Sequence, residues 1–263
     1  MIAALAGAFA SARAAGTQSG TLEDAQRLFY NGRYDAAAAL TFGRCSPETN
    51  DLAACELRTS TLLFQIKKTF GSPADKEEAW KGCGRCQELM ATFLAETAAG
   101  QALARARLKV TPEDEGALFL LGKLDLNYVW LHLGTLGRRT GWKEYWEAKR
   151  SLEQVLKQNP GHIRARVARA WIDYIVDTRM PRGTRWVLGG GNKKRGLRAV
   201  REAAETEGDV FIRAEAGFAL WDMQVRERNM TGAVATARGL ARDFPDNQDV
   251  NRFLTTHDHG TGR

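Results

Sequence analysis

The sequence predicts an all-α protein. Apolar residues recur at the three- and four-residue spacing of amphipathic helices, and the alternating pattern of half-buried strands is nearly absent. Of the 263 residues, 44% are hydrophobic and only 6 are proline, so the chain can bury a sizeable core and lacks the composition of a disordered protein. We therefore expect a globular fold in which helices pack on helices.

The first half of the chain is expected to form a helix pair followed by two longer helices. Residues 21–44 contain two apolar helical runs separated by Asn31-Gly32, which breaks the pattern. A longer helix is predicted over 51–70, and it ends at Gly71-Ser72-Pro73 because proline cannot continue a helix. The next helix is expected as one element over 76–108.

The second half begins with a helix-start signal, in which Thr111 is the cap, Pro112 takes the first helical position and acidic residues follow. The helix after it, over 116–133, is apolar on most sides. It carries Lys123 and Asp125, however, so we predict no membrane span. Four further helices are expected by their apolar spacing, at 161–177, 193–206, 211–225 and 231–243.

The two ends of the chain are expected to lie outside the helical domain. Residues 1–15 look like the end of a secretion signal, because a short apolar run is followed by Ala12-Arg13-Ala14, an A-x-A cleavage pattern. The basic n-region of such a signal is missing, so an ordinary alanine-rich helix start is the alternative. We expect a helical domain over 21–254, a flexible tail over 255–263 and a periplasmic location, with the cytoplasm as the alternative.

Three groups of residues fall at the spacing of the helices in a tetratricopeptide repeat (TPR). They are Tyr145-Trp146-Glu147-Ala148 with Leu152, Val155 and Pro160, then Gly32-Arg33-Tyr34 with Ala37, and finally Asp243-Phe244-Pro245-Asp246-Asn247. On these residues the chain resembles the TPR superfamily, and more narrowly the divergent TPR-like proteins exported by Gram-negative bacteria. The resemblance covers most of residues 21–250, and the best units are 113–160, 161–206 and 209–247.

This resemblance implies an α-solenoid of TPR-like antiparallel helix pairs that presents a concave surface to a protein or peptide partner in the cell envelope. It also implies a non-catalytic binding or scaffold protein without a cofactor, and no Ser-His-Asp, paired-carboxylate or HExxH pattern argues for an enzyme. The units are uneven in length, with insertions at 134–141 and 178–192. The alternative function is a small-ligand carrier, or an accessory protein of a transport system, with an aromatic pocket.

The four cysteines are even in number and closely spaced, which in an exported chain predicts two local disulfides, Cys45–Cys55 and Cys83–Cys86. Three connectivities are possible, and the spacing alone does not choose between them. The second pair is also a CxxC motif, so a thiol-exchange protein is a further alternative. Redox motifs of this kind usually follow a strand in a βαβ unit, and none is predicted here. Free core cysteines and a zinc site are the remaining interpretations.

A basic, glycine-rich segment is the sharpest local feature. Residues 178–201 hold eight basic side chains and no acidic one, enough to supply the whole net charge of +7. Such a patch favours an acidic protein or peptide partner, and Gly189–Gly191 before the helix cap Asn192 can present N–H groups to an anion. The alternative is a flexible loop with a solvated basic face, and export argues against nucleic acid. The predicted binding residues are Arg182, Arg185, Trp186, Asn192, Lys193 and Lys194.

Aromatic residues gather between positions 128 and 186, and most of them are expected in the core. Trp130, Trp142 and Trp186 fall near loops or on opposite faces, so they are candidates to line a groove for a partner or a small ligand. We therefore add Tyr128 and Trp130 to the predicted binding residues. His257-Asp258-His259 has no evident third ligand, so no metal site is predicted.

Overall fold

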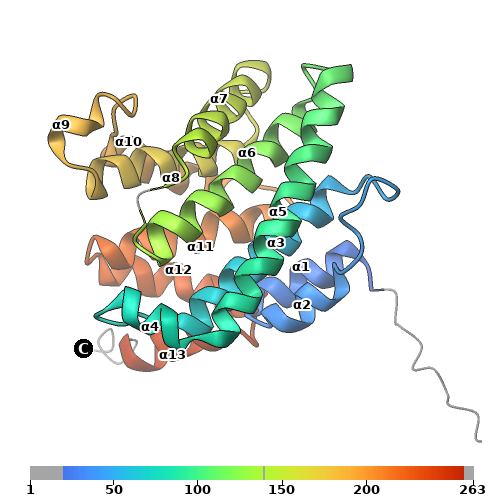
Figure 1. Ribbon diagram of the computed structural model, residues 1–263. Coiled ribbons are helices and arrows are strands. Elements are labelled where there is room, and N and C mark those ends of the chain that lie inside the picture. Colours follow the sequence, from blue (N-terminus) through green and yellow to red (C-terminus); the bar gives the residue numbers. More distant parts are fainter. Residues whose placement is uncertain (1–19, 139, 258–263) are drawn as a thin grey trace, which may run out of the picture.

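The computed structural model describes residues 20–138 and 140–257 (Figure 1). Within these ranges all regular structure is helical and no strand occurs, which confirms the all-α prediction. The elements are α1 (Leu22–Tyr30), α2 (Tyr34–Leu40), α3 (Leu52–Phe70), α4 (Lys76–Gly82), α5 (Gly84–Val110), α6 (Glu115–Val129), the π-helix η1 (Trp130–Thr135), α7 (Trp142–Gln158), α8 (Ile163–Arg179), α9 (Arg182–Arg185), α10 (Lys193–Glu205), α11 (Val210–Arg226), α12 (Met230–Asp243) and α13 (Gln248–His257).

Most of these limits agree with the sequence, but two expectations are wrong. The expected single helix over 76–108 breaks at Cys83, where the backbone leaves helical geometry between two glycines and so separates α4 from α5. The cap of α6 is Asp114 and not Thr111, because the Asp114 carboxylate accepts a hydrogen bond from the Ala117 N–H at 2.8 Å. In both places the local capping and breaking residues decide where the helix begins.

Long helices that follow one another pack as pairs. The pair of α6 and α7 is antiparallel: the Gln158 side chain at the end of α7 donates to the Glu113 carbonyl just before α6, at 3.3 Å. At the other end of the pair, Gly141 just before α7 approaches Tyr128 near the end of α6. Helices α3 and α5, α8 and α10, and α11 and α12 also pack as pairs, and the pairs contact one another in chain order.

The first helix reaches the last helix pair, so the row of helices closes on itself (Figure 1). Tyr30 at the end of α1 packs against three aromatic rings of the C-terminal part, with ring centres 5.2 Å from Phe244, 5.7 Å from Phe218 and 6.0 Å from Phe211. The Asn247 side-chain amide donates to the Tyr30 carbonyl at 2.7 Å. The N-terminal helix pair is therefore held by the C-terminal part as well as by α3.

The predictions for the two ends fall largely outside the described residues. The expected signal over 1–15 lies outside them, and so does the tail from position 258 onward. The last described helix, α13, extends to His257, so the first residues of the expected tail are helical. Its Val250 is buried against Ala237 and Leu240 of α12, which explains why the chain stays ordered beyond Asn247.

Candidate functional site

The glycine run at 189–191 ends a helical turn. The Gly189 N–H donates to the Trp186 carbonyl at 3.1 Å and the Gly190 N–H donates to the Arg185 carbonyl at 2.8 Å, which is the hydrogen-bond pattern of a Schellman cap. Both glycines have a left-handed φ, +82° and +73°, which other residues adopt at a cost. These two N–H groups are therefore engaged within the loop that follows α9 and are not presented to an anion.

The N-terminus of α10 is capped by groups of the chain itself. Asn192 accepts a hydrogen bond from the Arg195 N–H at 2.8 Å, which confirms the predicted helix cap. The Asp177 carboxylate from α8 accepts from the Lys193 N–H at 2.8 Å and from the Arg185 guanidinium at 2.6 Å. An internal carboxylate thus occupies the position that the sequence suggested for an external anion.

Three of the eight basic residues in the segment 178–201 are paired with acids that lie outside it. Arg185 pairs with Asp177, the Lys193 ammonium lies 2.7 Å from Glu227, and the Arg195 guanidinium lies 2.9 Å from Asp173. A count of charges along the segment does not include these acids, because they come from positions before and after it. The spacing of Asp173 and Asp177, one turn apart on α8, is the signal that would have indicated them.

Other basic residues of the segment remain exposed. Lys194, Arg198 and Arg201 follow the spacing i, i+4, i+7, so they lie on one face of α10, and the described residues provide no ion pair for them. In the adjoining loop, Trp186 is 78% exposed and Val187 is 51% exposed. We call these five residues the α9–α10 face, and Figure 1 shows α9 at the edge of the molecule beside α10.

The remaining predicted binding residues do not join this face as a group. Arg182 begins α9. Tyr128 and Trp130 lie at the junction of α6 and η1: the Tyr128 ring is 4.4 Å from that of His132, and the Trp130 ring packs edge-on against Trp171 at 6.3 Å. Both are half-buried, and Trp130 lines a cavity.

That cavity is an apolar pocket between the two insertions that the sequence indicated. Its free volume is about 20 Å³, and Leu188, a buried residue of the loop after α9, forms part of its wall. The Tyr145 hydroxyl donates to the Leu188 carbonyl at 2.9 Å, which fixes the loop against α7. The other lining residues come from α6, η1, the 140–141 turn, α7, α8 and the residue after α8, and they are Leu126, Val129, Trp130, Leu133, Thr140, Gly141, Trp142, Ile172, Ile175, Val176 and Met180.

Four charged side chains from α3, α6, α8 and α11 meet in the interior. The Lys123 ammonium lies 2.6 Å from Glu215 and 3.9 Å from Glu56, and the Arg164 guanidinium lies 2.5 Å from Glu215 and 3.5 Å from Glu56. Burial alone would raise the pKa of Glu215, but the positive charges of Arg164 and Lys123 outweigh it and lower that pKa to about 2. Because two cations neutralise two carboxylates, this cluster offers no free charge to a ligand.

A further buried acid, Asp125 on α6, has no positive partner in direct contact. Its side chain is fully buried, one oxygen accepts from the Gln101 amide at 2.6 Å, and the other has no partner among the described residues. Burial, followed by the negative charge of Glu147, raises the pKa of Asp125 to about 8. The Glu147 carboxylate is itself paired with Arg105 through two hydrogen bonds, at 3.0 and 2.5 Å. Asp125 is therefore mostly protonated in the folded protein at pH 7.

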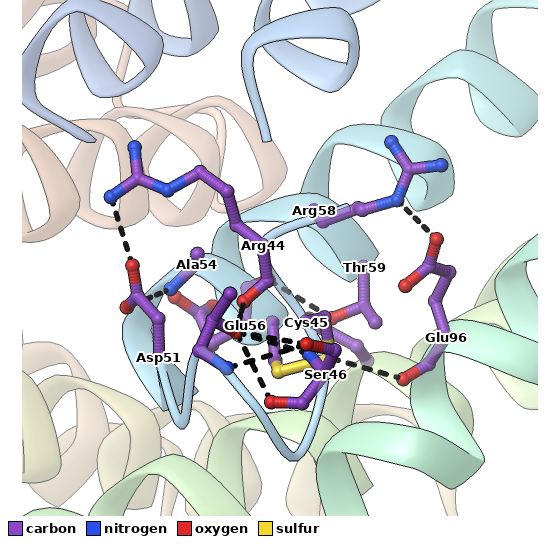
Figure 2. Close-up of a disulfide and its surroundings, with 12 residues drawn as sticks. Arg44, Cys45, Ser46, Asp51, Ala54, Glu56, Arg58, Thr59 and Glu96 are labelled. Atoms are coloured by element: carbon purple, nitrogen blue, oxygen red, sulfur yellow. Dashed lines mark hydrogen bonds and ion pairs between the residues drawn. A yellow bond between two sulfur atoms is a disulfide. The ribbon is translucent and has the colours of Figure 1, made fainter. Parts of the chain in front are cut away.

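The cysteines form the two local pairs that the sequence favoured, Cys45–Cys55 and Cys83–Cys86. Cys45 lies in the turn before α3 and Cys55 in its first turn, where Arg44 pairs with Asp51 beside the disulfide at 2.9 Å (Figure 2). Cys83 occupies the cap position of α5 and is half-buried, whereas Cys86 is fully buried. No strand precedes the CxxC motif in the described part of the chain.

Three observations bear on the chemistry that the chain can support. Across residues 20–138 and 140–257, no cluster of histidine, cysteine and acidic side chains is arranged to hold a metal ion. None of the helices in these ranges combines the length and apolar character that crossing a membrane requires. Comparisons with protein-family models, with curated proteins and with solved structures found no match.

Proposed function

We propose that the chain is a non-catalytic binding protein of the cell envelope, built as an α-solenoid of TPR-like antiparallel helix pairs, and that it binds an acidic protein or peptide. The observation that carries the proposal is the α9–α10 face, where an exposed tryptophan and valine in the loop before α10 are followed by three unpaired cations along that helix. Tryptophan and arginine are among the residues that contribute most to the binding energy of protein interfaces.

The antiparallel packing of α6 on α7, and the pairing of α8 with α10 and of α11 with α12, support the TPR-like part of the proposal. A regular TPR array binds its partner on the concave side. Here Lys123 and Arg164 are each paired with both Glu56 and Glu215, so these inner charges are already neutralised. We therefore place the partner on the outward α9–α10 face and not in the concave surface expected from the sequence.

The charge of the face indicates the chemistry of its partner. Lys194, Arg198 and Arg201 form a stripe along α10, and a partner with carboxylates at helical or extended spacing can pair with all three. The exposed ring of Trp186, in the loop before α10, supplies apolar contact area for the same partner. The two disulfides favour an oxidising compartment, which is the reason for placing this interaction in the envelope.

The test uses a fluorescent synthetic peptide of alternating glutamate and leucine, titrated with the wild-type protein at low and physiological salt. We expect Trp186→Ala to weaken binding by about 30-fold, which corresponds to about 2 kcal/mol at a central tryptophan. Reversing the charges of Lys194, Arg198 and Arg201 to glutamate should weaken binding at least as much. Added salt should weaken the wild-type interaction, because exposed charges contribute to it.

The matched control reverses three exposed basic residues elsewhere, Lys109→Glu, Lys157→Glu and Arg242→Glu, which changes the net charge by the same amount. Equal loss of binding in both triple variants would mean that net charge alone attracts the peptide, and the proposed site would be wrong. Binding of anionic phospholipid vesicles in place of the peptide, lost in Trp186→Ala, would replace the acidic protein partner by a lipid surface.

A further inference from the structure

We infer that the apolar pocket beneath Leu188 is a binding site for a small, neutral, single-ring apolar ligand, which enters when the Leu188 side chain swings out. This site is separate from the α9–α10 face, although the two share the loop after α9. The inference begins from the void that remains beside Leu188 and from the chemistry of the walls around it.

The walls of the pocket are almost entirely carbon. Trp130, Trp142 and Tyr145 contribute aromatic surface, while isoleucine, leucine, valine and methionine side chains supply the rest. The Tyr145 hydroxyl is already engaged by the Leu188 carbonyl. A water molecule in the remaining 20 Å³ would find few polar partners, and enclosed apolar voids of this kind bind hydrocarbon in preference to water. No charged side chain lines the pocket, which restricts the ligand to a neutral one.

The size of the ligand follows from what it must replace. In the closed form the void has room for one water-sized body only. Removing the four-carbon Leu188 side chain from the pocket joins its volume to this void and makes room for one six-membered ring. Such a ring can pack edge-on against Trp130 and Trp142, as aromatic side chains pack against one another.

The segment that carries Leu188 is built so that it can move without unfolding the helices on either side. It begins after Met180-Pro181 and ends at Gly189 and Gly190, whose left-handed φ angles turn the chain back toward α10. Its neighbours Trp186 and Val187 are exposed and make little contact with the rest of the chain. Opening therefore removes only one apolar side chain from the core.

A few polar contacts hold the segment closed. The Leu188 carbonyl accepts from Tyr145 at 2.9 Å and more weakly from Lys149 at 3.5 Å, and Arg185 pairs with Asp177. The ligand must compete with these contacts, so its apparent affinity is reduced by the fraction of molecules that are closed. Any change that weakens the closure without altering the walls should then tighten binding.

The test titrates the wild-type protein with toluene and follows the methyl signals of Leu188, Met180 and Ile172 by NMR. We expect saturable shifts confined to pocket methyl groups, the largest at Leu188, and a rise in melting temperature. Tyr145→Phe removes the hydroxyl but keeps the ring, and it should bind toluene about 2- to 10-fold more tightly, the equivalent of one hydrogen bond. The control Tyr174→Phe removes a buried hydroxyl that bonds Glu227 at 2.9 Å, away from the pocket, and should bind like the wild type.

Two outcomes would overturn the inference. The first is an absence of saturable shifts in the wild-type protein, which would mean that the pocket is closed core. The second is binding to Leu188→Ala alone, because the mutation would then have created the cavity. Neither outcome affects the acidic-peptide test, which monitors the outward side of the same loop, so the two proposals can fail separately.

Discussion

The side-chain oxygen of Asn31 accepts a hydrogen bond from the N–H of Asp246 at 3.1 Å, across 215 residues of sequence. Beside it, the Asn247 amide donates to the Tyr30 carbonyl, and the Tyr30 ring lies among aromatic rings of α11 and of the turn after α12. The first helix pair and the last one are thus joined by polar and apolar contacts. This closure distinguishes the protein from an open row of helices, in which the terminal pairs contact only their neighbours.

Tyr30→Ala should therefore lower the free energy of unfolding by about 2–3 kcal/mol, because it leaves an aromatic-sized gap between α1 and α11. Urea unfolding followed by circular dichroism measures this change. Trp186→Ala is the control: it also removes a large aromatic, but an exposed one, and should change stability by no more than about 0.5 kcal/mol. Equal effects of the two substitutions would show that the closure does not stabilise the fold.

Asp125 should make the protein lose stability as the pH rises. Its carboxyl group has a pKa of about 8 in the folded chain and an ordinary value of 3.8, so between these limits the folded state holds a proton that the unfolded state has released. The resulting contribution of Asp125 to the free energy of unfolding is complete below about pH 4 and disappears by about pH 8. It amounts to a few kcal/mol in that window, on the order of one per pH unit.

Asp125→Asn is the matched variant, because asparagine keeps the shape and can still accept from Gln101 but does not titrate in this range. Unfolding in urea at pH 5, 6, 7 and 8 should give a steeper fall for the wild type than for the variant. Parallel curves would mean that Asp125 has an ordinary pKa in the folded protein, because another group stabilises its buried carboxylate.

Removing one member of the interior charge cluster should strongly lower the free energy of unfolding. Glu215→Gln leaves Arg164 and Lys123 with only Glu56 as an anionic partner, and breaking a buried pair in this way costs about 3–5 kcal/mol. Glu23→Gln breaks the exposed pair with Arg27 and should cost less than about 0.5 kcal/mol. Similar losses of stability in the two variants would indicate that water reaches the cluster freely.

The low pKa of Glu215 also predicts a pH dependence. The extra stability of the wild type over Glu215→Gln should be lost as the pH falls from about 4.5 to about 2.

Arg228→Gly should stabilise the protein. Arg228 ends α11 in a Schellman cap with a φ of +58°, which costs a residue with a Cβ about 1 kcal/mol relative to glycine. The gain is expected as a rise of a few degrees in melting temperature. Gly32 holds the same position after α1, with a φ of +73°, so Gly32→Ala should lower the melting temperature by a similar amount. A drop on Arg228→Gly would show that the arginine side chain makes a compensating contact.

Much of the fold could be predicted because helices are encoded locally. The apolar spacing and the breakers at Asn31-Gly32 and Gly71-Ser72-Pro73 placed most helices within a few residues of their limits. The cysteine spacing favoured the two pairs that form, and Asn192 caps α10 as expected. Where local signals competed, as at Cys83 and at Thr111 against Asp114, the expected limit was wrong.

The candidate site was harder to predict, because the partners of its charges come from other helices. The segment 178–201 contains no acid, yet Asp173, Asp177 and Glu227 neutralise part of it. The glycine run looked like an anion nest, and instead it ends a helical turn. Leu188 carried no signal at all, since an apolar residue in a loop gains its role only from the pocket that it covers.

From the sequence alone it follows that the chain is helical and where most of its helices begin and end, and the cysteine spacing favours the two local pairs. These properties depend on neighbours within a few residues, through periodicity, caps and short loops. Three further features arise from the tertiary structure: α1 meets α11, four charges meet inside, and Trp186 stays exposed while Leu188 is buried two residues away. Such outcomes depend on contacts between residues far apart in the chain, and no local spacing encodes them.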